Sequence, residues 1–136
     1  MSPLKITDRD AATGPVVEIA GDLDYDTSPQ LRRLLDRVSV RKGGRLVLDL
    51  AGLEFCDSTG LTVLIAARNH ALQAGAEIAL AAVPPNTLRI LNVVGLDQIF
   101  ALYPSVDEAT GRAGAPGTDA DEGGESEDLK EASGAA

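Results

Sequence analysis

The sequence predicts an α/β fold, a single domain with one mixed sheet and packed α-helices. Short β-prone runs alternate with stretches whose apolar residues recur at helical spacing, a pattern typical of parallel strands joined through helices. A chain of 136 residues also has room for only one hydrophobic core. We therefore expect one domain over residues 1–112, followed by a tail over residues 113–136.

The predicted tail differs from the rest of the chain in composition. It carries seven acidic residues and one lysine, so it supplies −6 of the formal net charge of −9. Its one large apolar residue, Leu129, cannot bury enough surface to offset the entropy of ordering. We expect a disordered acidic tail that keeps the protein solvated, with a partner-specific role as the alternative.

The first elements predicted are a β-hairpin and a helix. Residues 4–6 and 16–19 form two β-prone runs, and the Asp, Gly and Pro of residues 10–15 favour a turn between them. The hydroxyls of Thr27 and Ser28, followed by Pro29, favour a helix start. The apolar stripe of this helix, which Gly43 and Gly44 end, consists of Leu31, Leu34, Leu35 and Val38.

The remaining elements alternate. Residues 45–50 and 76–83 are nearly continuous apolar runs, as in strands covered on both faces. Between them, a helix that starts near Ser58 and closes at Gly75 should bury one face, made of Leu61, Leu64, Ile65 and Leu72. A short helix with Leu88, Ile90, Leu91 and Val94 that ends at Gly95, a strand near residues 99–102 and a helix over residues 105–110 complete the order β-β-α-β-α-β-α-β-α.

Composition excludes several classes of function. A single cysteine, Cys56, and a single histidine, His70, allow neither a disulfide nor a four-ligand zinc site, and no glycine-rich nucleotide loop is present, so we expect no cofactor and no metal. The net negative charge argues against nucleic acid as a partner. The chain has neither an apolar run of about eighteen residues nor a secretion signal, which predicts a cytoplasmic protein without a membrane partner.

Ser58 is the candidate functional residue because it places a hydroxyl where an apolar run passes into a helix. Unpaired N–H groups and the dipole at a helix N-terminus favour an anion, so a phosphate on Ser58 could be accommodated. We expect Gly60 to leave room beside the hydroxyl for another protein's active site. The competing interpretation is that Asp57 or Ser58 merely caps the helix.

An acidic loop edge is expected around this serine. Asp22 and Asp24 follow the second strand, and they lie near Asp57 if both loops open on the same edge of the sheet. The alternative is that these aspartates serve turn formation alone.

A hydrolase that uses Ser58 as its nucleophile is disfavoured. A nucleophile needs a base within about 3 Å, whereas His70 follows twelve residues later on the same predicted helix, roughly 18 Å away. Cys56 ends an apolar run and is assigned to the core. We therefore expect a binding protein and not an enzyme.

Four segments together resemble the anti-sigma-factor antagonists of the STAS domain family, in order and in spacing, over roughly residues 3–110. These are Gly21-Asp22-Leu23-Asp24, Val47-Leu48-Asp49-Leu50, Phe55-Cys56-Asp57-Ser58-Thr59-Gly60-Leu61 and Gly95-Leu96. The resemblance implies a single STAS-type domain with a mixed four- to five-stranded sheet and packed α-helices. It implies that an anti-sigma factor with serine kinase activity phosphorylates Ser58 and that a protein phosphatase reverses the reaction. It implies that only the unphosphorylated form binds the kinase and so frees the sigma factor.

The resemblance also assigns the residues around the serine. Asp24 and Asp57 match acidic positions near the phosphorylated serine, and Thr59 occupies the neighbouring hydroxyl position. The expected partner-binding residues are Asp22, Asp24, Asp57, Ser58, Thr59 and Gly60. A STAS scaffold that binds its partners whatever the state of Ser58 remains the alternative, and the resemblance says nothing about the acidic tail.

Overall fold

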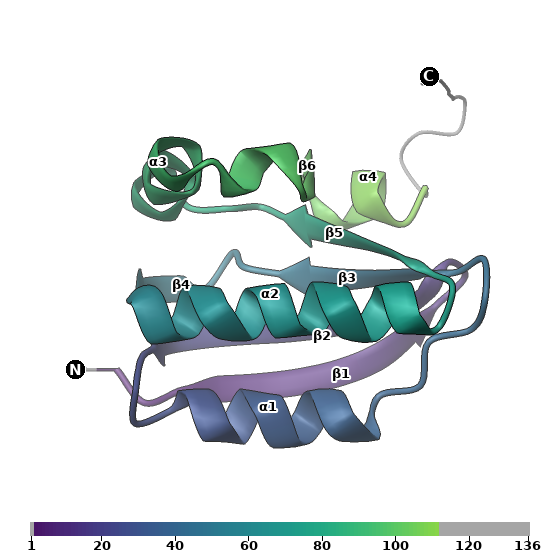
Figure 1. The fold of residues 1–136 in the computed structure, drawn as a ribbon, viewed down its shortest axis with the longest axis horizontal. Coiled ribbons are helices and arrows are strands. Elements are labelled where there is room, and N and C mark those ends of the chain that lie inside the picture. Colours follow the sequence, from purple (N-terminus) through teal and green to yellow (C-terminus); the bar gives the residue numbers. More distant parts are fainter. Residues whose placement is uncertain (1, 112–136) are drawn as a thin grey trace.

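Strands and helices alternate along residues 2–111, the part of the chain that the computed structural model describes (Figure 1). The expected tail over residues 113–136 lies outside this part. The elements are β1 (Lys5–Ala11), β2 (Gly14–Leu23), α1 (Ser28–Arg37), β3 (Arg45–Asp49), β4 (Leu53–Cys56), α2 (Ser58–Gln73), β5 (Glu77–Ala81), α3 (Pro85–Val94), the 3₁₀ helix η1 (Leu96–Gln98), β6 (Ala101–Tyr103) and α4 (Val106–Ala109). The predicted α/β class is confirmed.

One mixed sheet organises the domain. β1 and β2 pair antiparallel as the predicted hairpin, and the order continues in parallel through β3, β5 and β6. The turn of the hairpin is tighter than predicted, since only Ala12 and Thr13 lie between the two strands. The predicted strand near residues 99–102 is present but begins later, at Ala101.

The sheet of the described residues has six strands, one more than the upper limit that the family resemblance implies. The additional strand is β4, which pairs in parallel with the end of β2 beyond the segment that β3 occupies. β4 has four residues and contains the polar Glu54 between Leu53 and Phe55, so its sequence lacks the apolar run that marked the longer strands.

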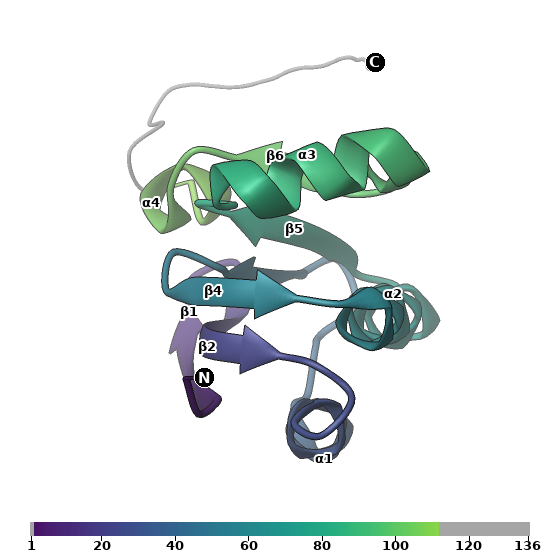
Figure 2. The same ribbon diagram turned by 90° about the vertical axis from the view of Figure 1, so that its left-hand side faces the viewer.

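Helices cover both faces of the sheet unequally (Figure 2). α1 and α2 pack side by side on one face, where the main core lies; its fully buried members include Ile19, Leu31, Leu48 and Leu64. The other face holds a smaller core under α4, built from Val16, Val47, Ala79, Ala81 and Ala109. α3 runs along the β5 side of the sheet.

The buried face of α2 differs from the prediction. Its buried residues are Gly60, Val63, Leu64, Ala67 and Ala71. Of the four residues expected to be buried, Leu64 alone is, and Leu72 is 48% exposed. Small residues line the buried face because the helix packs closely on strands and on α1, and a search for large apolar residues therefore selected the wrong face.

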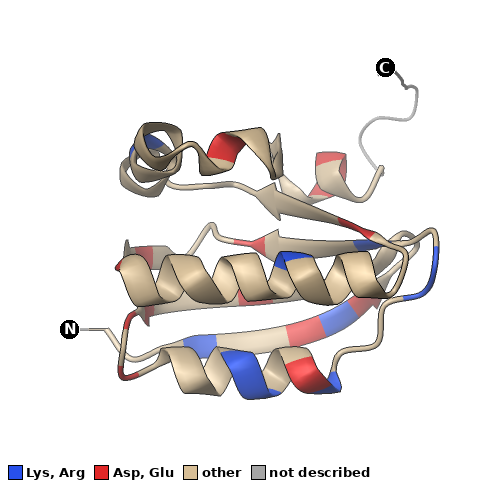
Figure 3. Cartoon of the chain, in the orientation of Figure 1, with Lys and Arg blue, Asp and Glu red and all other residues tan. Residues whose placement is uncertain are grey.

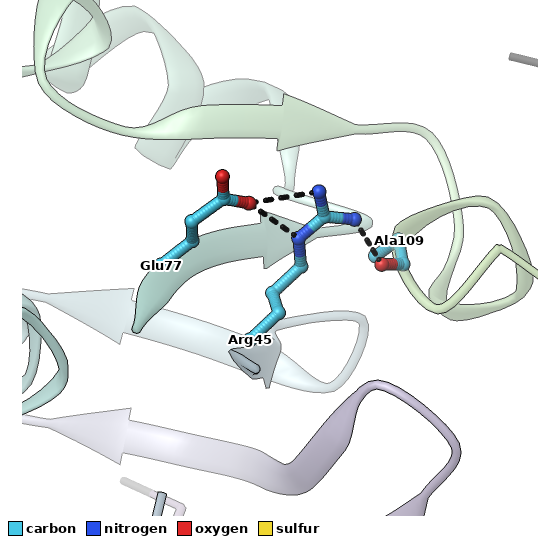
Figure 4. Close-up of polar contacts among 3 residues, drawn as sticks. All are labelled: Arg45, Glu77 and Ala109. Atoms are coloured by element: carbon cyan, nitrogen blue, oxygen red, sulfur yellow. Dashed lines mark hydrogen bonds and ion pairs between the residues drawn. The ribbon is translucent and has the colours of Figure 1, made fainter. Parts of the chain in front are cut away.

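The Arg45 side chain links the start of β3 to α4 (Figure 4). Its guanidinium donates to the carbonyl oxygen of Ala109 at 2.8 Å, pairs with Glu77 at 3.0 Å and lies 5.3 Å from the ring centre of Tyr103. The Arg45 side chain is mostly buried, whereas the Glu77 side chain is 71% exposed. The hydrogen bond to Ala109 should therefore contribute more stability than the ion pair.

We expect Arg45→Ala to lower the free energy of unfolding by about 1–3 kcal/mol, because it removes a charge-assisted hydrogen bond to a carbonyl. Glu77→Ala should cost less than about 1 kcal/mol, because solvent screens an exposed carboxylate. Urea denaturation of both variants measures the difference. Equal losses in the two variants would show that the ion pair with Glu77, and not the hydrogen bond to Ala109, accounts for the stability that Arg45 contributes.

Candidate functional site

The candidate site lies where β2 and β4 end. Leu23 and Cys56 are paired at the carboxyl ends of these parallel strands, and the Asp57 amide donates to the Leu23 carbonyl at 3.2 Å. The loop from β2 to α1 and the start of α2 therefore open on the same edge, which Figure 2 shows from the front. The expected proximity of the two loops is confirmed.

Asp57 caps α2 and also ties the two loops together. Its Oδ1 accepts a hydrogen bond from the Gly60 amide at 2.9 Å, which satisfies one of the unpaired donors of the first turn. Its Oδ2 accepts from the Tyr25 amide at 3.2 Å. Of the two residues that could cap the helix, Asp57 does so, and the Ser58 hydroxyl is left for another role.

Ser58 is the first residue of α2 and is exposed. No hydrogen bond joins its hydroxyl to another described residue, while its carbonyl oxygen accepts from the Thr62 hydroxyl at 3.0 Å. The neighbouring Thr59 is partly buried. Of the two adjacent hydroxyls, the one on Ser58 is therefore the more accessible to another protein.

Gly60 is buried, and its lack of a side chain serves the interior of the domain. A Cβ atom at this position would come within 2.6 Å of the Leu23 carbonyl oxygen and 2.8 Å of the Cys56 sulfur. The glycine allows α2 to approach β2 and β4 closely, which brings Ser58 to the edge of the sheet. The expectation that Gly60 leaves room beside the Ser58 hydroxyl for a partner's active site is therefore wrong, because Leu23 and Cys56 fill the space that a side chain at Gly60 would occupy.

The loop aspartates organise the segment between β2 and α1. Asp24 Oδ1 accepts hydrogen bonds from the amides of Asp26 and Thr27, each at 3.0 Å. The Thr27 hydroxyl donates to the Asp22 carbonyl oxygen. Asp22 itself accepts from the Ser2 amide. Turn formation is thus one role of Asp24. The Thr27 side chain holds this loop instead of capping α1, contrary to the prediction.

Cys56 belongs to the core, as predicted. It is 6% exposed, and burial, followed by the nearby Asp57 carboxylate, raises the pKa of its thiol to about 12. We expect the thiol to resist alkylation by iodoacetamide at neutral pH in the folded protein and to react after denaturation, since the thiolate is the reactive form. Rapid labelling of the folded chain would contradict this placement.

His70 lies far from the serine. Its Nε2 is 2.8 Å from the Val38 carbonyl oxygen, so it links the end of α2 to the end of α1. Ser58 and His70 occupy the same helix twelve residues apart, a rise of roughly 18 Å. The imidazole therefore cannot act as a base for Ser58.

Negative charge gathers around the serine (Figure 3). The acids at the ends of β2 and β4 and just after these strands are Asp22, Asp24, Asp26, Glu54 and Asp57. Nowhere in residues 2–111 do three or more His, Cys, Asp or Glu side chains form a group that could hold a metal ion. No helix in the same range is long and apolar enough to cross a membrane.

Sequence reasoning missed two residues at this edge, Tyr25 and Phe55. Both are exposed, by 76% and 51%. Each stands within three residues of Asp22, Asp57 or Ser58 in the sequence. The signal that could have found them is the rarity of aromatic residues in this chain, which has four.

The fold and the site define a small α/β domain that presents one serine at a helix start on an acidic edge of its sheet. The family model of the STAS domain matches residues 4–109. The chain belongs to the STAS domain family.

The chain is similar to several anti-sigma factor antagonists. The chain is 35% identical over 89 residues to the anti-sigma F factor antagonist of Paenibacillus polymyxa, which covers 65% of this chain and 76% of that protein. It is 30% identical to the anti-sigma-F factor antagonist of Mycobacterium tuberculosis, over 69% and 76% of the two chains. The crystal structure of an anti-sigma factor antagonist from Mycobacterium paratuberculosis matches with a TM-score of 0.69 at 32% identity, over 78% of this chain and 90% of that one.

Proposed function

We propose that this protein is an anti-sigma factor antagonist that acts by binding and not by catalysis. In its unphosphorylated form it binds an anti-sigma factor with serine kinase activity and so releases the sigma factor. Phosphorylation of Ser58 ends the binding, and a protein phosphatase restores it. The relatives named as antagonists support the partner class, and a cytoplasmic location follows from this role.

The main support for the proposed switch is that the exposed Ser58 hydroxyl lies in the first turn of a helix that Asp57 already caps. A kinase can therefore reach the hydroxyl without unfolding α2. The first-turn amides and the helix dipole favour the phosphate once it is attached. The covalent change should leave the domain folded and alter only the surface that the partner contacts.

Charge explains why the phosphorylated form would dissociate. A kinase must bring the phosphates of its nucleotide to the Ser58 hydroxyl. After transfer, a phosphoserine with about −1.5 to −2 charges faces the remaining nucleotide phosphates and stands beside Asp57. Like charges at the centre of a docked surface oppose binding, and the dianion loses its hydration there.

A pull-down from cells tests the proposed partner class. Ser58→Ala protein, which cannot be phosphorylated at this position, should retain an anti-sigma factor, and Ser58→Glu protein should not. Recovery of the same anti-sigma factor by both variants would favour a STAS scaffold that does not switch. Absence of any anti-sigma factor from both would contradict the proposed partner.

A further inference from the structure

Two of the four aromatic side chains of this protein are exposed at one edge. Tyr25 is 76% and Phe55 is 51% exposed, whereas Phe100 is 5% exposed and Tyr103 is partly buried. An aromatic ring buries a large apolar area when it is covered, and such rings are enriched at the centres of protein interfaces. The exposure of Tyr25 and Phe55 therefore indicates a role other than stabilising the fold.

Tyr25 and Phe55 both lie close to Ser58 in the fold. Phe55 lies on β4, paired with Asp22 of β2 and three residues before the serine. Tyr25 lies on the opposite loop, and its amide donates to the same Asp57 carboxylate that caps the helix of Ser58. Asp24 accepts two further amides of this loop, so the loop is held in place before any partner arrives. A segment fixed in advance loses little entropy on binding.

The two segments that carry the rings are acidic. Residues 10–31 and 46–67, which contain Tyr25, Phe55 and Ser58, hold no lysine, arginine or histidine. The five carboxylates of Asp22, Asp24, Asp26, Glu54 and Asp57 are contributed by these two segments. The complementary surface is one with apolar pockets surrounded by lysine and arginine.

We propose that Tyr25 and Phe55 are the two anchors by which this edge docks a partner protein whose apolar pockets are ringed by basic residues. The proposal rests on the proposed function in identifying that partner with the anti-sigma factor. It adds that affinity comes from the two rings, while the state of the nearby Ser58 decides whether docking is permitted. A second copy of this chain is a poor occupant, because it would set one acidic edge against another.

Alanine variants measured against the purified anti-sigma factor test the anchors. Tyr25→Ala and Phe55→Ala should each weaken binding at least about tenfold, as truncation of an anchor does, whereas Tyr25→Phe should retain most of the affinity. Leu72→Ala is the matched control. Leu72 is 48% exposed on the same helix as Ser58, but roughly 21 Å further along it, and its variant should bind as the wild type does.

The salt dependence of binding and a charge-reversal variant test whether basic residues surround the partner's apolar pockets. The association rate should fall as salt rises, and Asp26→Lys should reduce both the rate and its salt dependence. Thermal melting of each variant checks that it is folded. Unchanged affinity in both aromatic variants, or losses equal to that of Leu72→Ala, would overturn the proposal.

Photocrosslinking in cells separates this proposal from the proposed function. A photoreactive phenylalanine analogue at position 25 or 55, but not at position 72, should crosslink to one protein. Purified Tyr25→Ala protein should then bind that protein with reduced affinity. If that protein is not an anti-sigma factor, the proposed function fails and the anchors stand. Absence of crosslinks from both positions, or dimers of this chain that Tyr25→Ala dissolves, would overturn the docking proposal.

Discussion

Ser58→Glu protein should bind its anti-sigma factor about 10- to 100-fold more weakly than the wild type, a loss of roughly 1.4–2.8 kcal/mol. The carboxylate would face the nucleotide phosphates of the kinase and would lose its hydration at the centre of the contact. Its own fold should not suffer, because a negative charge in the first turn of α2 is favourable by about 0.3–1 kcal/mol. Interferometry and thermal melting on the same preparations measure the two effects separately.

The control for this variant is Ser39→Glu. Ser39 is an exposed serine just after Val38, whose carbonyl is joined to His70 at the far end of α2. It receives the same added charge away from the edge and should bind normally. Equal weakening by both variants would mean that net charge, and not the position of Ser58, controls binding.

Ser58→Ala protein should accept no phosphate and remain bound to the kinase, while Thr59→Ala protein should still be phosphorylated. The alanine at position 58 should cost less than about 0.5 kcal/mol of stability, because Asp57 and not Ser58 caps the helix. Thr59 is partly buried and turned about 100° around the helix from Ser58. A time course of phosphate incorporation with each variant measures the difference.

The opposite pattern would assign the switch to Thr59. Full incorporation into Ser58→Ala protein and none into Thr59→Ala protein would contradict the choice of serine. A structural effect of either substitution is excluded when the variant melts like the wild type.

Long elements could be predicted from the sequence because their patterns repeat. The apolar run Leu46-Val47-Leu48 of β3 predicts a buried strand, and the apolar stripe of α1 predicts which face of that helix is buried. β4 could not be predicted, since its four residues acquire strand geometry only by pairing with the end of β2. The face of α2 was wrong because close packing favours Gly60, Ala67 and Ala71 over the larger Leu72.

The candidate site, too, could be predicted only in part from the sequence. The position of Ser58 and its acidic neighbours could be predicted, because the carboxyl ends of parallel strands share one edge. The bond from Tyr25 to Asp57 and the close approach at Gly60 join segments more than thirty residues apart. Such contacts depend on the assembled fold and left no local pattern in the sequence.

The most direct test of the switch is made on a single sample. The wild-type protein is incubated with its anti-sigma factor and ATP, and peptide mass spectrometry locates the phosphate while size-exclusion chromatography follows the complex. We predict one phosphate, on Ser58, and separation of the phosphorylated chain from the kinase. A chain phosphorylated on Ser58 that still elutes with the kinase would contradict the account.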